Sequence, residues 1–177
     1  MSYKKIITDS QQGSQRRVSE IWKETQQIEK LTEDYFKNFI NNDDGSFIIR
    51  FAPPRKHPEW DVKVFFQRDL VETYIELKGE FEAQDYGSCF VEYLEGGKPS
   101  GLALTKSDYY YFLTGSEGKP TDAYLVPTWK VKEIGRNTPK NLHKSGGING
   151  SATGFLLKLH LIDDFKVSSF GTNYCIY

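Results

Sequence analysis

The chain has few cysteines and histidines and no long apolar segment. Its 177 residues include 2 Cys and 3 His. Cys89 and Cys175 form no metal-ligand spacing, and neither has a His beside it in the sequence. This argues against a disulfide scaffold and the common zinc motifs, and it predicts a reducing, cytosolic setting. No apolar run follows Met1 that would serve as a signal peptide or a membrane span, so we expect neither.

An excess of charge is also missing. Lys and Arg number 23 against 24 Asp and Glu, which gives a formal net charge of −1. The chain as a whole therefore exerts no general attraction on nucleic acid, and a nucleic-acid-binding function would need local basic patches. The three His residues follow no nucleophile motif, which argues against Ser/His/Asp and Cys/His catalysis.

Aromatic residues, in contrast, are abundant. The chain has 11 Tyr and 12 Phe, and aromatic residues make up 15% of it. Such a chain is too apolar for an intrinsically disordered protein, and its length suits one domain with its own core. We expect a flexible N-terminal lead at 1–13 and a single domain at 14–177.

A hairpin is predicted between Asp61 and Lys78, where the sequence reads DVKVFFQRDLVETYIELK. Side chains at i and i+2 share one face of a strand, so Glu76 and Lys78 point the same way. If the two strands pair antiparallel, Asp61 meets Glu76 and Lys78 at one rim of the hairpin. Asp69 competes as the first acid, but it falls in the predicted turn, where Asp is common. We therefore prefer Asp61.

Two carboxylates and an amine in one place suit metal-assisted hydrolysis of a phosphodiester. Mg²⁺ prefers oxygen ligands and usually keeps several waters, so one or two carboxylates suffice to hold it. The ion lowers the pKa of an attacking water, and a nearby ammonium orients that water or offsets charge on the phosphate. Without a cation, two adjacent carboxylates repel and one tends to stay protonated. The alternative is a half-buried hairpin whose outer face carries ordinary surface charges.

This arrangement resembles the PD-(D/E)XK nuclease superfamily, whose core pattern is an Asp near one strand start, a hairpin turn and Glu-X-Lys on the next strand. Asp61 matches the first position, and Glu76-Leu77-Lys78 matches the tripeptide. The Pro-Asp half departs from the pattern, because Glu59 and Trp60 separate Pro58 from Asp61. The resemblance extends over GSCFVEYLEGGKPSGLALTKSDYY at 87–110. A similar run in phage and bacterial members has a strand ending in Glu-Tyr, then Lys-Pro-Ser-Gly, then a helix opened by Thr.

The resemblance implies a restriction-endonuclease-like α/β sandwich with a mixed central β-sheet flanked by helices. It implies a Mg²⁺-dependent deoxyribonuclease in which Mn²⁺ can substitute, with Asp61 and Glu76 as metal ligands and Lys78 positioning the attacking water. DNA is the implied partner, many members are homodimers, and the implied setting is a bacterial or phage-infected host cell. Restriction, recombination, repair and replication all stay open, as does RNA as the substrate. A non-catalytic nucleic-acid- or protein-binding module on the same fold is the alternative function.

Two further acids are candidates for the site. Superfamily members often place an acid from the first helix near the metal, and Glu33 or Glu20 fits by position. An apolar stripe at i, i+3 and i+4 spacing predicts that helix up to Ile40. Glu92, on a strand predicted at 89–94, either joins the site or pairs with Lys63 across strands. For the helical acids, the alternative is a solvated helix face.

Contacts to the DNA backbone are predicted for two basic segments. One is the loop before Asp61 that contains Arg55 and Lys56, where the lone His57 is not assigned as a ligand. In the other, from 130 to 144, five basic residues accompany a single acid: Lys130, Lys132, Arg136, Lys140 and Lys144. Solvated loops and a solvated helix are the alternative.

The remaining elements follow from pattern and capping signals. Thr105, with Asp108 three residues later, predicts a helix with an aromatic body at 109–113. Thr128 predicts the N-cap of a short helix that uses Trp129 and Val131 as apolar contacts. Further strands are predicted at 46–51, 123–126 and 155–159, with an edge strand in the tail at 167–177. This order of helices and strands is that of an α/β fold with a mixed sheet.

Overall fold

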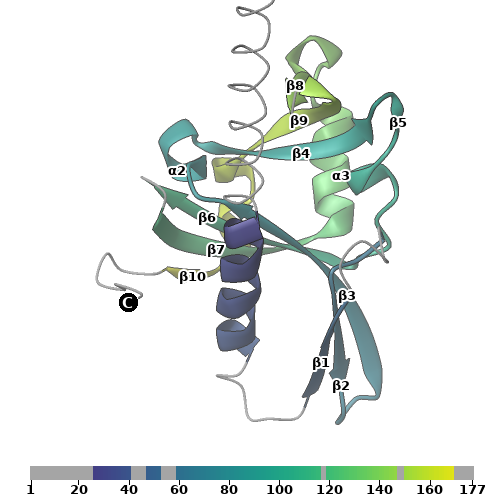
Figure 1. The fold of residues 1–177 in the computed structure, drawn as a ribbon, viewed down its shortest axis with the longest axis vertical. Helices are drawn as coiled ribbons and strands as arrows, with labels where there is room; N and C mark the ends of the chain where they lie inside the picture. The colour runs from purple at the N-terminus through teal and green to yellow at the C-terminus, as the bar shows by residue number, and fades with distance from the viewer. Residues whose placement is uncertain (1–25, 41–46, 53–58, 117–118, 147–149, 170–177) are drawn as a thin grey trace, which may run out of the picture.

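The computed structural model describes residues 26–40, 47–52, 59–116, 119–146 and 150–169. The expected lead at 1–13, Glu20 and the loop with Arg55 and Lys56 lie outside these residues. The described chain begins with a helix over 26–40 (Figure 1). It continues through β1 Phe47–Phe51, β2 Val62–Phe66, β3 Val71–Glu80, α2 Ala83–Tyr86, β4 Ser88–Glu95, β5 Lys98–Pro99, η1 Gly101–Ala103, β6 Tyr109–Ser116, β7 Lys119–Pro127, α3 Thr128–Asn137, η2 Lys140–Leu142, β8 Lys144–Gly146, β9 Ala152–Lys158, η4 Leu159–Leu161, η5 Asp163–Phe165 and β10 Lys166–Ser169.

A six-stranded mixed sheet forms the centre of this α/β fold, in the order β1-β2-β3-β6-β7-β10. Neighbouring strands run antiparallel except β3 and β6, which run parallel with Glu76 opposite Tyr110. The predicted hairpin is confirmed as β2 and β3, whose ladder runs from Val62↔Ile75 to Phe66↔Val71. A parallel pair needs a long crossover connection. Here α2, β4, β5 and η1 make up that crossover.

A second sheet, in the order β5-β4-β9-β8, packs against one face of the central sheet (Figure 1). Phe112 of β6 shares a buried cluster with Val91 of β4, Phe155 of β9 and Val131 of α3. The strand expected at 89–94 therefore exists as β4, but it does not extend the β2–β3 hairpin. The chain leaves β3 through α2 and turns at Gly87, whose φ of 63° is easily reached only by glycine.

The helix over 26–40 covers the other face of the central sheet (Figure 1). Its apolar stripe packs inward as predicted. Phe36 is fully buried, with its ring centroid 5.0 Å from that of Tyr111 on β6. Gly79 of β3 lies so close to the helix that a Cβ there would collide with Thr32 and Ile28. The absence of a side chain at Gly79 therefore allows the helix to pack directly on β3.

The helix predicted at 109–113 is wrong, because this segment is strand β6. Six of its eight residues are buried, as expected for a central strand covered on both faces, and aromatic residues favour such a position. The signal read as a capping box is a local turn: the Thr105 hydroxyl accepts a hydrogen bond from the Ser107 N–H at 3.1 Å. Sequence periodicity alone does not separate a short buried helix from a strand of this kind.

The short helix after β7 is confirmed as α3, but two of its predicted contacts are wrong. Thr128 is the first helical residue rather than the N-cap, and its buried hydroxyl has no hydrogen-bond partner among the described residues. Trp129 is 62% exposed, whereas Val131 is buried as expected. The helix packs through Val131 and Ile134, which share one face at i, i+3 spacing, and Trp129 lies off that face.

The other predicted strands appear with modest shifts of their ends. Strands β1, β7 and β9 correspond to the predicted strands at 46–51, 123–126 and 155–159. Strand β10 is the expected edge strand of the tail, and residues beyond 169 lie outside the described chain. No helix in the described ranges is long and apolar enough to cross a membrane.

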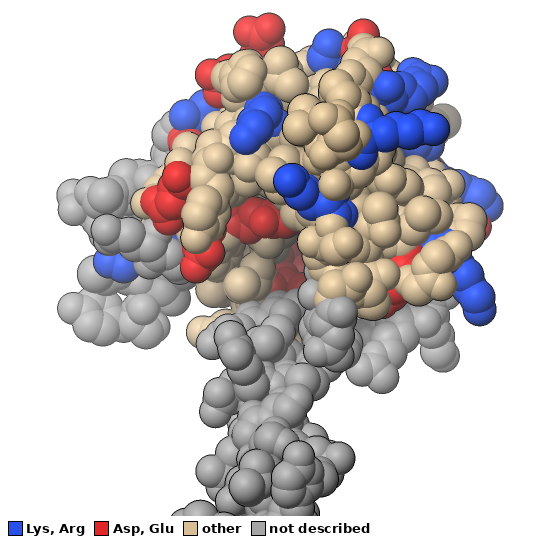
Figure 2. Space-filling view, turned by 90° about the horizontal axis from the view of Figure 1, so that it is seen from above, with Lys and Arg blue, Asp and Glu red and all other residues tan. Residues whose placement is uncertain are grey.

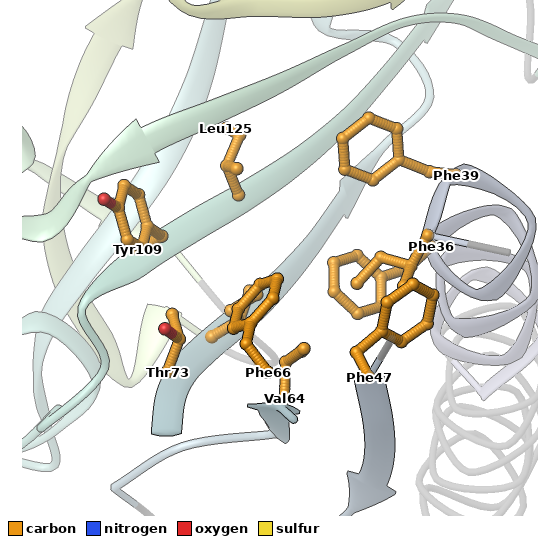
Figure 3. A pocket seen from close by; sticks show the side chains of 10 residues that line it. Phe36, Phe39, Phe47, Val64, Phe66, Thr73, Tyr109 and Leu125 are labelled. Carbon is orange, nitrogen blue, oxygen red and sulfur yellow. The ribbon is translucent and has the colours of Figure 1, made fainter. Parts of the chain in front are cut away.

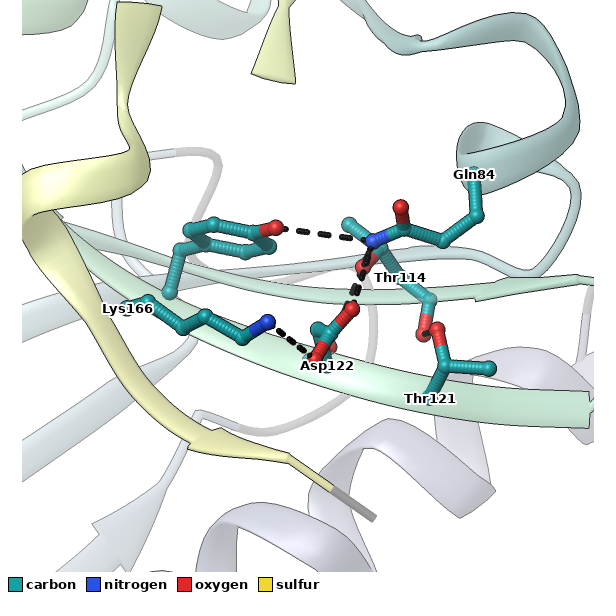
Figure 4. Close-up of polar contacts among 6 residues, drawn as sticks. Gln84, Thr114, Thr121, Asp122 and Lys166 are labelled. Atoms are coloured by element: carbon teal, nitrogen blue, oxygen red, sulfur yellow. Dashed lines mark hydrogen bonds and ion pairs between the residues drawn. The ribbon is translucent and has the colours of Figure 1, made fainter. Parts of the chain in front are cut away.

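A network of hydrogen bonds and one ion pair connects α2 with strands β6, β7 and β10 of the central sheet (Figure 4). The Gln84 side-chain amide donates to Thr114 Oγ1 and to Asp122 Oδ2, each at 2.9 Å. The other oxygen of Asp122 lies 2.6 Å from Lys166 Nζ on β10. These contacts hold α2, the first element of the crossover, against β6 and β7, and β7 is joined in the same network to β10.

An apolar cavity of about 480 Å³ lies between the end of the helix and the β1–β3 strands (Figure 3). Phe36 and Phe39 reach it from the helix, and Phe47 and Phe66 reach it from β1 and β2. It lies on the helix-covered face of the sheet, away from the face that carries Glu76 and Lys78.

Candidate active site

Asp61 occupies a free edge of β3, at the point where the β2–β3 ladder ends. The last ladder pair is Val62↔Ile75, and the Asp61 N–H donates to the Ile75 carbonyl at 3.1 Å. The Asp61 carboxylate then accepts a hydrogen bond from the Leu77 N–H, with Oδ2 2.8 Å from the nitrogen. A side chain thus takes the place of a strand and satisfies a backbone donor that the edge would otherwise leave open.

Glu76 stands beside Asp61 and is held by two hydroxyls from the turn before β6. Thr105 Oγ1 lies 3.3 Å from Glu76 Oε2 and 3.1 Å from the Glu59 carbonyl, so its one proton has two acceptors within reach. The Ser107 hydroxyl is a second donor toward the Glu76 carboxylate. Thr105 and Ser107 are both buried, at 5% and 4% exposure. A rigid turn therefore orients the Glu76 side chain.

Both carboxyl groups are costly to ionise at this position. Burial is the largest cause that raises the pKa of Glu76, to about 7, and the negative charge of Asp61 adds to it. Burial likewise raises the pKa of Asp61, and only the hydrogen bond from Leu77 and the charge of Lys78 oppose this. Near neutral pH the pair therefore retains a proton for part of the time. A bound cation would remove that penalty.

Lys78 completes the predicted trio. It lies two residues beyond Glu76 and therefore on the same face of β3. Its positive charge favours ionisation of both Asp61 and Glu76. It also acts on Glu80, whose pKa burial raises and whose carboxylate accepts a hydrogen bond from the Phe90 N–H on β4. The structure thus brings Asp61 next to Glu76 and places Lys78 near enough for its charge to act on both, while the catalytic roles predicted for the three stay predictions.

The helix over 26–40 adds negative charge to this edge. Glu29 is the stronger contributor and Glu33 the weaker, and both raise the pKa of Asp61. Glu33 also lies 3.8 Å from Lys37, one turn further along the helix. Glu29 was not among the candidates read from the sequence, but it lies one helical turn before Glu33 and could have been found by that spacing.

Glu92 lies on β4 of the second sheet, whereas Glu76 lies on β3 of the central sheet. Its charge contributes to raising the pKa of Tyr110, after burial, Glu76 and Asp61. The alternative pairing of Glu92 with Lys63 is wrong: Lys63 Nζ lies 2.6 Å from Glu72 Oε1 on the adjacent strand. Since β4 belongs to the second sheet, it is not a cross-strand neighbour of β2.

Sequence reasoning missed Thr105, Ser107 and Tyr110. Tyr110 pairs with Glu76 in the parallel β3–β6 register, and its hydroxyl hydrogen-bonds with Thr105. Burial and the charges of Glu76 and Asp61 raise the pKa of Tyr110, so its hydroxyl stays protonated. The only signal in the sequence was the TKSDYY run, which was assigned to a helix. Placing it on a strand beside β3 would have put these side chains next to Glu76.

A hollow adjoins the acidic edge. A cavity of about 550 Å³ is lined by Glu29, Lys78 and Glu80, among others, where the helix meets the end of β3. Figure 2 shows acidic side chains lining a hollow on the face seen from above, with Lys and Arg gathered along one flank.

The donor set suits a hard cation that keeps much of its water. Within the described chain, no group of three or more His, Cys, Asp or Glu side chains is placed to hold a metal ion. Asp61 and Glu76 form a two-carboxylate set whose pKa values are raised first by burial and then by nearby acids, Glu29 and Glu33 for Asp61 and Asp61 for Glu76. Mg²⁺ is commonly held by one or two carboxylates with water completing its shell. The residues present therefore fit Mg²⁺ better than an ion that demands an all-protein site.

The basic residues predicted to contact DNA stand apart from this edge. Lys130 is paired with Glu133 at 2.8 Å. No hydrogen bond or ion pair in the described ranges links Lys132, Arg136, Lys140 or Lys144 to Asp61 or Glu76. Between them, His143 bridges Tyr93, at 2.6 Å from Nδ1, and the Thr138 carbonyl, at 3.2 Å from Nε2. A carbonyl only accepts, so Nε2 carries a proton and His143 serves as a structural link.

Comparisons of the chain with protein-family models, with curated proteins and with solved structures found no match.

Proposed function

We propose that the protein is a metal-dependent DNA endonuclease that hydrolyses phosphodiester bonds. The observation that carries the proposal is the edge of β3 that has no strand partner within the described chain. There Asp61 accepts a hydrogen bond from the Leu77 N–H, the charge of Asp61 raises the pKa of Glu76, and Lys78 lies on the same face as Glu76. An isolated pair of partly buried carboxylates with raised pKa values is a common sign of a functional site.

Each residue has a distinct role in this proposal. Asp61 and Glu76 hold Mg²⁺, with Mn²⁺ as a substitute, and Glu29 and Glu33 add negative charge behind Asp61. Thr105 and Ser107 fix the direction of the Glu76 carboxylate. Lys78 orients the attacking water and offsets charge that develops on the phosphate. When bound, the metal supplies Lewis-acid polarisation of the phosphoryl group.

The finer fold assignment belongs to the same proposal. A restriction-endonuclease-like sandwich is supported by the mixed sheet, by the helix over 26–40 on one face and by the placement of Asp61 and Glu76 on adjacent strands. The second sheet, to which the β3–β6 crossover contributes β4 and β5 and the later chain contributes β8 and β9, is an elaboration that the predicted architecture did not include. Binding to the DNA backbone is proposed for Lys132, Arg136 and Lys140 on and after α3, with Lys130 and Lys144 as flanking contacts.

The test is cleavage of labelled duplex, single-stranded and four-way-junction DNA, with RNA as a further substrate, in Mg²⁺, Mn²⁺ or EDTA. We expect cutting that EDTA abolishes and that Asp61→Asn and Glu76→Gln both lose. Glu72→Gln is the matched control, since this exposed carboxylate lies on the same hairpin but pairs with Lys63. Cleavage that persists in EDTA, or at the parental rate in both site variants, would overturn the proposal.

A non-catalytic nucleic-acid- or protein-binding module is the second candidate. The absence of a three-ligand group among the described residues favours it. Calorimetric titration of Mg²⁺ and Mn²⁺ separates the two candidates, because the nuclease requires metal binding that Asp61→Asn removes. Duplex binding without any such metal binding would support the module.

A further inference from the structure

A second sheet edge without a full partner strand lies on β9, away from Asp61 and Glu76. Of the residues proposed to contact DNA, only the flanking Lys130 and Lys144 border it. Strand β8 pairs with β9 only from Ala152 to Gly154. On that side, Phe155 to Lys158 have no strand partner within the described chain. A cavity of about 470 Å³ opens along this edge, between β9 and the segment from α3 to β8. Its volume is within the rough range of 300–1,000 Å³ typical of ligand-binding clefts.

Two hydrogen bonds determine which backbone groups of β9 face this cavity. The Leu159 N–H donates to the Gly87 carbonyl, so residue 159 points its backbone toward β4. The Phe90 N–H points away from β9, because it donates to the Glu80 carboxylate. In an antiparallel ladder, backbone groups alternate between the two sides. Since Phe90 pairs with Leu156, the N–H and C=O of Leu156, and by the same alternation of Lys158, are directed into the cavity.

The side chains along the cavity are apolar at the floor and basic at the rim. Leu142 is 51% exposed, Leu156 36% and Leu161 45%, and all three line the cavity. Lys144 and Lys158 are exposed at its rim, and neither forms an ion pair with another described residue. Lys130, the third lysine, is already neutralised by Glu133. The groove therefore carries a net positive charge.

These features fit an extended peptide better than a nucleic acid. Phosphate contacts need Lys and Arg but make no use of exposed leucines. An unpaired strand edge with exposed apolar side chains is an aggregation hazard unless a partner or a covering segment pairs with it. Strand addition uses the backbone groups of the edge for affinity and alternate side-chain pockets for specificity. The two free lysines then select for acidic residues between the apolar ones.

We propose that the β9 groove binds an acidic, apolar peptide segment of a partner protein by β-strand addition. The peptide pairs with the backbone of Leu156 and Lys158. Its apolar side chains contact Leu142, Leu156 and Leu161, and its carboxylates lie near Lys144 and Lys158. The surface is built from residues outside the Asp61–Glu76 edge, so this binding does not depend on nuclease activity.

The probe is a fluorescein-labelled nonapeptide of alternating Leu and Asp or Glu, followed by fluorescence anisotropy with the full chain. We expect saturable binding with a Kd of about 10–100 µM, typical of a short segment with a few anchors. The same peptide with N-methyl groups on alternate backbone nitrogens should bind at least about tenfold more weakly, because it cannot complete the ladder. Equal affinity of the methylated peptide would exclude strand addition.

Two variants test the side chains of the groove. Lys158→Glu reverses the charge at its rim and Leu161→Asp places a charge on its apolar floor, and we expect each to weaken peptide binding about tenfold or more. Arg136→Glu is the matched control, because it makes the same charge change on exposed α3 surface outside the cavity. Equal weakening by Lys158→Glu and Arg136→Glu would indicate nonspecific attraction and overturn the proposal. Competition by DNA would overturn it too. If a labelled duplex displaces the peptide and Lys158→Glu weakens the binding of that duplex, the groove binds DNA. The absence of saturable peptide binding by folded protein would overturn it as well.

Discussion

Within the described chain, an interior strand of each sheet has a partner over only part of its length on one side, yet the two exposed edges, on β3 and β9, have opposite chemistry. At β3, the partner strand β2 ends at Val62, and at β9, the partner strand β8 ends at the pair Lys144↔Gly154. The first edge is occupied by the Asp61 carboxylate, which accepts from Leu77 and lies beside Glu76. The second is bordered by leucines and unpaired lysines.

The difference teaches that what fills a strand edge decides what the edge does. A carboxylate that replaces a strand brings negative charge into a half-buried place, and the neighbouring acids turn this into a site that favours a cation. An edge with only apolar and basic side chains keeps its backbone groups available and favours a peptide.

Catalysis should depend on the β3 edge alone. Lys78→Met removes the ammonium that orients water, and we expect the cleavage rate to fall about 10²–10³-fold while DNA binding is retained. Lys63→Met is the matched control on the same hairpin face, and Leu161→Asp is the control at the β9 edge. Single-turnover cleavage with bound DNA measures the effect. A rate in Lys78→Met equal to that of Lys63→Met would remove Lys78 from the mechanism.

The position of the helix should depend on one glycine of β3. Gly79→Ala places a Cβ against Thr32 and Ile28, and we expect it to lower the free energy of unfolding by about 1–3 kcal/mol. The displaced helix carries Glu29 and Glu33, so activity should fall as well. Urea unfolding provides the measurement.

The control for this change is Gly96→Ala. Gly96 has a φ of 55° but nothing within 4 Å of the added Cβ, so that variant reports backbone strain without a collision. We expect it to cost about 1 kcal/mol and to leave the helix in place. Equal effects of both variants on activity would mean that the contact at Gly79 does not position the helix.

The stability of the metal-free protein should fall as pH rises. The pKa of Glu76 is raised to about 7 by burial and by Asp61, against an ordinary value of 4.5. Between these values the folded state binds a proton that the unfolded state has released, so stability decreases from about pH 4.5 to 7 and is then constant. We expect a loss on the order of 2 kcal/mol between pH 5 and 8, measured by urea unfolding.

Glu76→Gln should flatten this pH profile, and Mg²⁺ should restore the stability of the parental protein at pH 8 by binding only the folded state. Glu72 is the contrasting group, because its hydrogen bond with Lys63 lowers its pKa. If the stability of Glu76→Gln depends on pH in the same way as that of the parental protein, the raised pKa of Glu76 is not the cause of the pH dependence.

The β9 edge should contribute little to stability. Leu161→Ala removes a side chain that is 45% exposed, and we expect a loss of about 0.5 kcal/mol or less together with weaker peptide binding. Leu157→Ala, on the same segment but fully buried, should cost about 2–5 kcal/mol. Thermal unfolding of the two variants compares them. A large effect of Leu161→Ala would make the groove part of the core instead of a binding surface.

Local sequence patterns predicted the β2–β3 hairpin correctly. The alternation from Asp61 to Lys78 predicted both strands, their turn and the face shared by Glu76 and Lys78, because period-two patterning is a property of the strand itself. The same local reasoning failed at 109–113, where a strand buried on both faces lacks any alternation. It also failed for β4, since nothing in the segment 88–95 indicates which sheet it joins.

Patterns in the sequence predicted an α/β fold with a mixed sheet, the β2–β3 hairpin and the strand face that Glu76 shares with Lys78, because these features depend on residues close together in the chain. The folded chain was needed to show that Thr105, Ser107 and Tyr110 lie around Glu76, through the parallel β3–β6 register, and that Glu29 on the helix is close enough to act on Asp61. It also decided which strand edges stay free. Each of these depends on contacts between segments that are distant in the chain, and a local pattern carries no record of such contacts.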